Sequence, residues 1–363
     1  MSIIPKTIDE VTVDWLSAVL NDTIEGFEVT QIGQGVGLMG DIFRVSLQRS
    51  NMASAGPESV VVKLPSSFED NRAQGVALGM FEAEVRFYKS LATQVSVGLP
   101  AVYLAEIIEG TADFVIVMED LSRLTLVSQT DGMTLDQTFA AVRVLATIHA
   151  VWWDRAKAPE YEWILAMTGP RIEYVDQLLV QILPAFLEGF GHCLPEGGEA
   201  LYTLFAGNYL KFNATLAARS PWTIAHQDYR VENLMFGAEG SGEVMVIDWQ
   251  GIGRGPGAYD LAYLLGGSMD VQLRRDHEHE LVKAYHDQLL LSGIAGYSFE
   301  QAFEDYGFAH LMGGLATAMV TGGTMDLSND RGKQLVETMA SRHVTAALDH
   351  DGLARAKAVL QQN

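Results

Sequence analysis

Polar and hydrophobic residues alternate along the first third of the chain, and this pattern predicts β-strands. Alternating or β-branched runs cover residues 42–47, 59–64, 101–107 and 113–118. A further strand at residues 29–32 leads into a glycine-rich turn.

Helical spacing occurs at two places in this first part and then dominates the rest of the chain. Residues 14–20 form a short helix in a lead-in, and residues 81–91 carry apolar positions at i, i+4, i+7 and i+10. A longer helix begins after Thr134, where Gln137 completes a capping-box pattern. Further helices are predicted at residues 171–188, 197–217, 276–292 and, with breaks, 299–361.

A β-hairpin interrupts the helical part. Apolar runs at residues 233–236 and 243–247 flank a glycine-containing turn, and the return strand is expected to bring Asp248 towards Asn233. The pattern as a whole predicts an α+β chain. We expect a small β-rich N-lobe over residues 1–120 and a larger, mainly helical C-lobe over residues 121–363.

Composition places the chain among folded globular proteins and excludes one class of partner. It has 363 residues, of which 48% are hydrophobic and 19% charged, so two domains or lobes are expected. The net charge of −22, without any run of Lys and Arg, argues against nucleic acid as a partner. Such acidity could attract a cationic substrate, although a solvated acidic surface is its commoner cause.

Cysteine usage and hydropathy bear on the cellular compartment. Cys193 is the only cysteine, which excludes an intrachain disulfide and suits a reducing compartment. No secretory hydrophobic segment occurs near the start, and we expect a cytoplasmic protein that is a monomer or homodimer. Residues 307–325 are nearly free of charge, but their glycines, threonines and His310 predict a buried, closely packed helix and no membrane span.

The first sign of specific chemistry is the octet His-Gln-Asp-Tyr-Arg-Val-Glu-Asn at residues 226–233, followed by Asp248 after the hairpin. Phosphoryl transfer from ATP needs one carboxylate to orient the attacking hydroxyl and accept its proton. It also needs an amide oxygen and a second carboxylate to hold Mg²⁺ on the phosphates. Asp228 fits the first role, and Asn233 with Asp248 fits the second.

A glycine-rich turn between two strands offers a place for phosphates. Gly33, Gly35, Gly37 and Gly40 fall within eight positions. Without a Cβ, their backbone N–H groups can approach phosphate oxygens closely. The spacing matches no standard phosphate-binding motif, and a plain hairpin turn explains it equally well.

A lysine and a glutamate are spaced to link the strand at residues 59–64 to the helix at residues 81–91. Lys63 lies near the end of the valine-rich strand, and Glu84 follows 21 residues later on the helix. An ion pair of this kind positions the phosphate-binding lysine in kinases. Glu82 is the competing partner, and a solvated lysine with an exposed glutamate is the alternative without function.

These motifs, in this order, resemble those of the aminoglycoside phosphotransferase and choline kinase-like superfamily. The series is the glycine-rich turn, Val-Val-Val-Lys63, Phe-Glu-Ala-Glu84, Val-Met-Glu-Asp-Leu121, the octet, Asp248-Trp-Gln and Gly-Pro-Gly-Ala-Tyr-Asp260-Leu-Ala. The ecdysteroid kinase-like branch and its bacterial relatives are similar in sharing Asp-Trp-Gln and Gly-Pro-x-x-x-Asp-Leu-Ala. The resemblance covers about residues 33–267.

The resemblance implies a protein-kinase-like bilobal fold that binds ATP and Mg²⁺ between its lobes. Asp228 would be the catalytic carboxylate, and Asn233 and Asp248 the metal ligands. His226 would support the loop, and Asp260 would tie it in place from the next helix. Residues of the N-lobe and of a hinge at residues 117–122 would bind the nucleotide, namely Gly35, Gly37, Lys63, Glu84, Glu119 and Leu121.

Two histidines and a glutamine need separate expectations. His149 lies on an apolar helical face and is predicted to be a hydrogen-bonded core residue, and His226 is also more consistent with a structural role. Relatives usually have glycine where this chain has Gln227. Because a glutamine cannot keep a glycine-only conformation, we expect a negative φ there.

The acceptor is the least determined part of the function. The resemblance implies phosphorylation of a hydroxyl group on a small molecule and permits aminoglycosides, amino alcohols, hydroxylated steroids and hydroxyacyl thioesters. The Met, Trp, Leu and Gly content of the C-lobe favours a lipophilic hydroxylated metabolite. Aromatic residues at positions 152, 153, 161 and 163 either line the acceptor pocket or pack between helices. A nucleotide-binding pseudokinase is the alternative, against which the complete acid–amide–acid set argues.

Overall fold

A computed structural model describes residues 4–33, 40–49, 56–324 and 330–361. The chain divides into two compact units. The first comprises Met1–Leu124 and Met245–Gly251, and the second comprises Thr125–Val244 and Ile252–Asn363.

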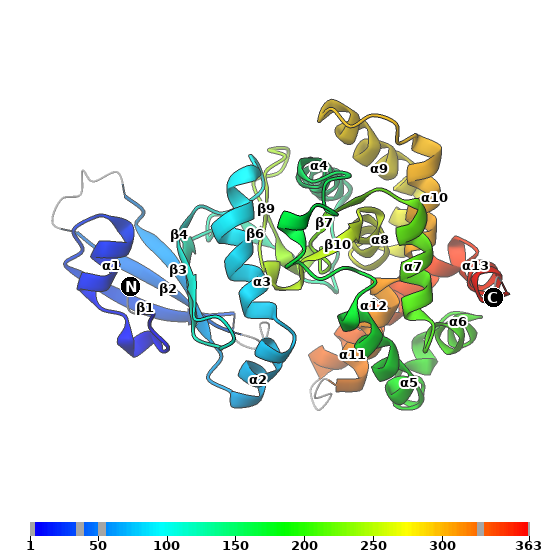
Figure 1. Cartoon of the computed structure of the whole chain (residues 1–363), viewed down its shortest axis with the longest axis horizontal. Coiled ribbons are helices and arrows are strands. Elements are labelled where there is room, and N and C mark those ends of the chain that lie inside the picture. Colours follow the sequence, from blue (N-terminus) through cyan, green and yellow to red (C-terminus); the bar gives the residue numbers. More distant parts are fainter. Residues whose placement is uncertain (1–3, 34–39, 50–55, 325–329, 362–363) are drawn as a thin grey trace. The chain divides into compact units, whose positions relative to one another are not determined.

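A five-stranded antiparallel sheet organises the first unit (Figure 1). Its strand order is β1-β2-β3-β5-β4, and all five predicted strands are confirmed. The first of them begins at Gly26, three residues before its predicted start. The strands are β1 (Gly26–Ile32), β2 (Gly40–Gln48), β3 (Ser59–Pro65), β4 (Val102–Ile107) and β5 (Phe114–Glu119).

Alternation along β3 decides what each face of the sheet contacts. Val60, Val62 and Leu64 are buried in one core cluster with Leu16 of α1 (Val13–Leu20). Side chains one residue out of phase point to the opposite face, so Lys63 faces away from this cluster. On that opposite face α3 (Met80–Arg86) packs against β4 and β5.

The helical segments beside this sheet were predicted only in part. The helix expected over residues 81–91 is present as α3 followed by a π-helical segment η2 (Phe87–Leu91) and a 3₁₀ turn η3 (Ala92–Gln94). Helix α2 (Glu69–Ala77) was missed because it has almost no apolar face: Gly75 is its one buried residue. A Cβ on Gly75 would lie 2.2 Å from the Phe81 ring, so close packing onto α3 explains the glycine.

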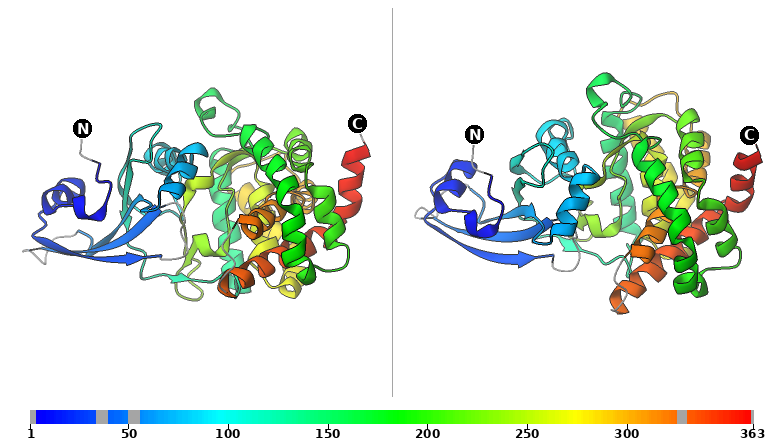
Figure 2. Two further views of the ribbon diagram at one scale, coloured as in Figure 1. Left: turned by 90° about the horizontal axis from the view of Figure 1, so that it is seen from below. Right: turned by 60° about the horizontal axis from the view of Figure 1, so that its bottom comes forward.

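The second unit is mainly helical, as the sequence predicted (Figures 1 and 2). The segment predicted at residues 197–217 is two helices, and the one at 299–361 is four. The capping box of Thr134 and Gln137 is present at the start of α4. The helices are α4 (Leu135–Val151), α5 (Pro170–Phe190), α6 (Gly198–Phe205), α7 (Tyr209–Arg219), α8 (Ala258–Gly267), α9 (Val271–Leu291), α10 (Phe299–Ala309), α11 (Gly313–Thr324), α12 (Asp330–Asp349) and α13 (Gly352–Gln361).

Short strands interrupt the helices of this unit. The predicted hairpin is confirmed as β8 (Leu234–Phe236) and β9 (Val244–Val246), in a sheet of order β6-β8-β9 with β6 (Thr125–Leu126). The last two residues of β9 belong to the first unit. The Gly237 N–H donates to the Glu243 carbonyl at 2.9 Å across its turn. The antiparallel pair β7 (Trp222–Ala225) and β10 (Gly253–Pro256) was not predicted, because four-residue strands give too little alternation to recognise. Three 3₁₀ turns complete this unit, η4 (Pro159–Tyr161), η5 (Gly191–Cys193) and η6 (Val231–Asn233).

The apolar segment at residues 307–325 is not one helix as predicted. Helix α10 ends at Ala309, and α11 begins at Gly313. Over the ranges that the structure describes, no helix is long and apolar enough to cross a membrane.

Glycines of α8 and α11 make room for a buried histidine on α12. A Cβ on Gly267 would lie 2.4 Å from Nε2 of His343, and one on Gly314 would lie 2.2 Å from its Nδ1. The ring is 3% exposed and lies 5.3 Å from that of Tyr263, centroid to centroid. Burial, and then the charge of Arg342, lowers the pKa of His343 to about 3.

This histidine should make the fold sensitive to acid. A neutral His343 in the folded state and an ordinary pKa near 6.5 in the unfolded state mean that only the unfolded chain gains a proton as pH falls below 6.5. From pH 7.5 to pH 5 the group should therefore remove about 2 kcal/mol from the free energy of unfolding. Urea unfolding of His343→Gln should show a correspondingly shallower loss than the wild type, and equal losses would contradict this assignment.

Candidate functional site

Two carboxylates of the first unit surround the ammonium group of Lys63. Its ammonium Nζ lies 2.8 Å and 2.9 Å from the two carboxylate oxygens of Glu84 and 3.1 Å from Oδ1 of Asp248. Glu82, the competing partner, instead accepts the Gly110 N–H at 2.7 Å. Lys63, Glu84 and Asp248 are called the lysine trio below.

Burial and charge act against each other within the lysine trio. Burial alone would lower the pKa of Lys63, but the carboxylates of Asp248 and Glu84 outweigh it and raise that pKa, so the lysine stays charged. Burial raises the pKa of Glu84, with the ammonium of Lys63 acting against it. With both carboxylates ionised the trio carries a net charge of −1. Asp248, whose side chain is 39% exposed, is its accessible edge.

Asp248 has an unusual backbone conformation. Its φ is 64°, in the left-handed region that few residues other than glycine adopt. Such a conformation costs about 1 kcal/mol or more and persists only where the surroundings fix it. The ion pair with Lys63 is one of the contacts that hold this residue.

The predicted glycine-rich turn is described only at its two ends. Gly33 has a φ of 69°, and a Cβ on Gly40 would lie 2.9 Å from the Leu64 carbonyl oxygen, so both positions favour glycine. Gly35 and Gly37 lie outside the described residues.

The segment predicted to be the hinge follows β5. The Glu119 N–H donates to the Ala101 carbonyl at 2.8 Å, its Oε2 accepts the Ala101 N–H at 3.2 Å, and Leu121 is buried. Asp120 between them accepts from Ser59 Oγ at 2.6 Å and Arg44 Nε at 2.8 Å. Burial would raise the pKa of Asp120, but these hydrogen bonds and one from the backbone of Ser122 hold it below its ordinary value. Asp120 therefore anchors this segment to the sheet.

The octet at residues 226–233 forms a loop in the second unit with its polar atoms bonded to one another. Asn233 Nδ2 donates to Asp228 Oδ2 at 2.8 Å and to the Asp228 carbonyl at 2.9 Å. Oδ1 of Asp228 accepts from the Tyr263 hydroxyl at 2.9 Å and lies 3.3 Å from Arg230 Nε. Because Asn233 uses its amide nitrogen in both bonds, its Oδ1 keeps its lone pairs for another partner.

Asp260 holds the start of this loop from α8. Its carboxylate accepts the backbone N–H of His226 at 2.6 Å and that of Gln227 at 2.9 Å. His149 is fully buried, with Nε2 3.2 Å from Asp260 and Nδ1 2.8 Å from the Tyr285 hydroxyl. His149 is therefore the predicted hydrogen-bonded core residue, and it also orients Asp260. His226 Nδ1 accepts the Asp228 N–H at 3.3 Å, consistent with support of the loop.

The sequence matches a known protein family over most of its length. The sequence model of the ecdysteroid kinase-like family matches residues 34–292, well over half of the chain. The chain belongs to this family. A comparison with curated proteins finds no match.

Solved structures of low sequence identity show the same fold as this ecdysteroid kinase-like protein. A choline kinase from Cryptosporidium parvum has a TM-score of 0.58 at 11% identity, over 96% of this chain and 98% of that one. An ethanolamine kinase from Plasmodium vivax has a TM-score of 0.53 at 12% identity, over 89% and 82% of the two chains. The fold is therefore protein-kinase-like, as the sequence predicted.

Gln227 does not have the expected negative φ. Its φ is 65°, so the conformation that glycine favours is kept by a residue with a Cβ. The Asp260 bond to its N–H fixes the backbone, and Arg171 donates to its side-chain oxygen. A Cβ on Gly253 would lie 2.2 Å from Gln227 Nε2, so this glycine provides the space that the longer side chain needs.

The oxygen donors of the predicted metal ligands suit Mg²⁺. Magnesium bound to nucleotide phosphates takes one or two protein oxygens and completes its shell with phosphate and water. Asp248 Oδ atoms and Asn233 Oδ1 are donors of this type. Within the described ranges no three His, Cys, Asp or Glu side chains are grouped to hold a metal.

Several residues that contact Asp228 or hold the segment after β5 were not predicted. Tyr263 and Arg230 contact Asp228, and Asp120 anchors the hinge segment. Tyr263 could have been found, because it lies three residues after Asp260 on one helix and therefore faces the same way. Of the aromatic group at residues 152, 153, 161 and 163, the first three are buried, which indicates helix packing, and Trp163 is half-buried.

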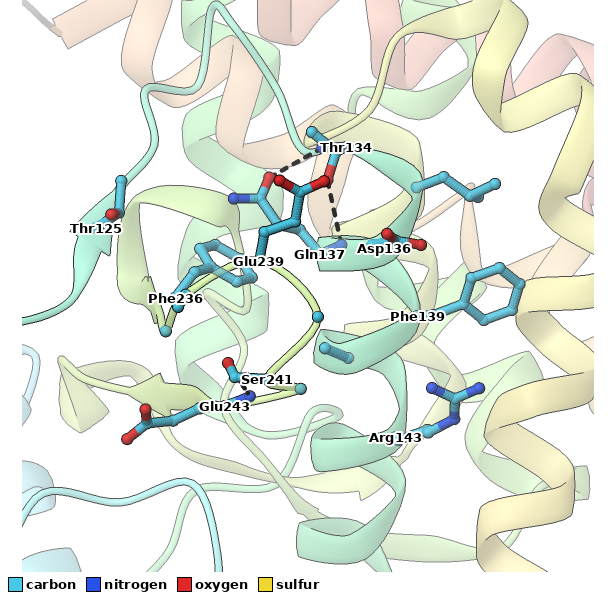
Figure 3. A pocket seen from close by; sticks show the side chains of 16 residues that line it. Thr125, Thr134, Asp136, Gln137, Phe139, Arg143, Phe236, Glu239, Ser241 and Glu243 are labelled. Atoms are coloured by element: carbon cyan, nitrogen blue, oxygen red, sulfur yellow. Dashed lines mark hydrogen bonds between the residues drawn. The ribbon is translucent and has the colours of Figure 1, made fainter.

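A groove of about 850 Å³ in the second unit lies apart from the predicted site residues. It runs between the start of α4 and the turn that joins β8 to β9, as Figure 3 shows for Thr134, Gln137, Glu239 and Ser241. None of the residues predicted to bind nucleotide, metal or acceptor lines it.

Replacing Glu84 and, separately, Glu82 should show which glutamate stabilises the buried ammonium of Lys63. Glu84→Ala leaves the Lys63 ammonium buried with Asp248 alone, and we expect a loss of about 3 kcal/mol in the free energy of unfolding. Glu82→Ala is the matched control on the same helix and should cost no more than about 1 kcal/mol, since its partner is one backbone N–H. Urea titrations measure both, and similar losses would contradict the assignment of Glu84.

Proposed function

We propose that this protein is an ATP-dependent kinase that transfers a phosphoryl group to a hydroxyl of a small molecule. The observation that carries the proposal is the carboxylate of Asp228, 36% exposed and fixed in orientation by Asn233 and Tyr263. A positioned carboxylate with an accessible edge is what an attacking hydroxyl requires. Membership of a kinase-like family supports the same reaction.

Each unit contributes defined residues to the proposed reaction. In the predicted N-lobe over residues 1–120, Gly35, Gly37, Lys63, Glu84 and Glu119 would bind the nucleotide, together with Leu121 at the start of the predicted C-lobe. In the predicted C-lobe over residues 121–363, Asp228 would accept the proton as the acceptor oxygen bonds to the γ-phosphorus and the bond to ADP breaks. Asn233 and Asp248 would hold Mg²⁺, which supplies charge neutralisation on the phosphates.

The surroundings of Asp228 favour a neutral or lipophilic acceptor over a cationic one. Tyr263 contacts Asp228, and its ring stacks on that of Tyr259 with centroids 6.3 Å apart. The hydroxyl of Tyr259 lies 3.5 Å from that of Tyr209. The neighbouring carboxylate of Glu232 is paired with Arg230. A site for aminoglycosides, which carry several ammonium groups, needs several carboxylates near the acceptor, and we propose a lipophilic hydroxylated metabolite in their place.

Removal of the catalytic carboxylate should separate binding from reaction. Asp228→Ala should abolish phosphoryl transfer and leave the affinity for MgATP within about threefold, because the carboxylate acts in the transition state. Isothermal titration with MgATP and a coupled ADP-release assay measure the two quantities. Wild-type turnover in this variant would refute the role of Asp228.

Loss of one hydrogen bond to Asp228 should have a smaller effect. Tyr263→Phe removes the hydroxyl that orients Oδ1 and should lower kcat about tenfold, equivalent to about 1.4 kcal/mol, with little change in the KM for ATP. Steady-state kinetics with an accepted alcohol give both constants. An unchanged kcat would show that Asn233 and Arg230 alone orient the carboxylate.

An acceptor screen decides between the kinase and the pseudokinase. ADP release should be measured with an aminoglycoside, choline, a hydroxylated steroid and a hydroxyacyl thioester, with Asp228→Ala as the blank. Turnover with the steroid or the thioester supports the lipophilic acceptor. No turnover with any of the four would favour a nucleotide-binding pseudokinase.

A further inference from the structure

Two aromatic rings connect the loop of Asp248 to the helix of Glu84. Trp249 follows Asp248 directly, and Phe87 follows Glu84 by three residues. Their rings are nearly parallel, 7° apart, with centroids separated by 3.8 Å. Both side chains are almost fully buried, at 1% and 0% exposure, and all four residues belong to the first unit.

The helix changes its winding at this contact. Helix α3 ends at Arg86, and a π-helical segment begins at Phe87. A π-turn adds a residue to the turn and changes which side chains face a neighbour. Here Glu84 contacts Lys63, while Phe87 contacts Trp249.

Further contacts fix the loop around Trp249. The Trp249 indole N–H donates to the Val246 carbonyl at 3.2 Å, and the Val246 N–H donates to the Gly98 carbonyl at 2.7 Å. Gln250 is buried and hydrogen-bonds to Glu84. Residues on both sides of Asp248 are therefore anchored, which explains how its left-handed φ of 64° is maintained.

We propose that Trp249, through its stack on Phe87, is a positioning residue that holds Asp248 in its metal-binding conformation before any nucleotide arrives. The lysine trio and the aromatic stack join the same two segments at adjacent positions. Loss of the stack removes one of the contacts that hold the unfavourable backbone conformation of Asp248. The inference rests on the proposed function, in which Asp248 binds Mg²⁺ with the nucleotide.

A positioning role makes a different prediction from a packing role. If Trp249 only fills the core, its replacement lowers stability and leaves the binding of magnesium unchanged. If it positions Asp248, its replacement weakens the contribution of Mg²⁺ to nucleotide affinity. ADP measured with Mg²⁺ and with EDTA separates these two effects and needs no acceptor.

The experiment is isothermal titration of ADP into the full-length wild type, Trp249→Leu, Trp249→Phe and Phe87→Leu, each below its unfolding temperature. In the wild type Mg²⁺ should tighten ADP binding. In Trp249→Leu and Phe87→Leu this gain should be about tenfold smaller, because mutation of residues that orient metal ligands typically has an effect of that size. The ADP affinity of both variants in EDTA should stay within about twofold of the wild-type value. Trp249→Phe, which keeps a ring on Phe87, should recover most of the gain.

Phe81→Leu is the matched control. Phe81 stacks on Phe114 in the same unit, with centroids 4.8 Å apart. It should lose thermal stability and keep the full Mg²⁺ effect. A full Mg²⁺ effect in Trp249→Leu, or an equal loss in Phe81→Leu, would overturn the positioning role. If the wild type binds no ADP at all, the proposed function fails and this inference fails with it.

Discussion

The buried ammonium of Lys63 is the constraint on which the first unit depends. A lysine that is 6% exposed requires opposite charge close by, since burial of an unpaired ammonium is strongly unfavourable. Glu84 and Asp248 supply that charge from two segments 164 residues apart in the chain. The strand, the helix and the returning loop are therefore held in a fixed arrangement by one cation.

The second unit uses an anion in the corresponding way. Asp260 is fully buried and is compensated by two backbone N–H groups and by His149. Because the two N–H groups belong to the consecutive residues His226 and Gln227, the carboxylate fixes the peptide groups on both sides of His226. This explains how Gln227 can occupy a conformation that glycine favours. Tyr263, on the same face of α8 as Asp260, donates a hydrogen bond to Asp228 itself.

The sequence predicted well those features that follow from local periodicity or from a motif. Strand alternation predicted that Lys63 lies in β3. The kinase-like order of motifs suggested Glu84 as its partner, with Glu82 as the competing choice. The capping box of Thr134 and the hairpin before Asp248 were likewise local signals. The roles of Asp228, Asn233 and Asp248 in catalysis and metal binding remain predictions.

Other features could not be read from the chain because they depend on packing partners distant in sequence. Helix α2 has no apolar face and is explained only by the fit of Gly75 against Phe81. The sign of φ at Gln227 was predicted wrongly, because the contacts that stabilise a positive φ there come from residues distant in sequence. These are Arg171, Gly253 and Asp260. The π-turn at Phe87 has no sequence signature of its own, and its reason is the stack on Trp249.

We propose that the lysine trio is assembled in advance and receives the magnesium nucleotide. A crystal structure of the full-length protein with MgADP tests this assembly. We expect Mg²⁺ bound to an oxygen of Asp248 and Lys63 Nζ within hydrogen-bonding distance of a phosphate oxygen, with the contact between Lys63 and Glu84 retained. Nucleotide bound without Asp248 on the metal, or with Lys63 separated from Glu84, would contradict it.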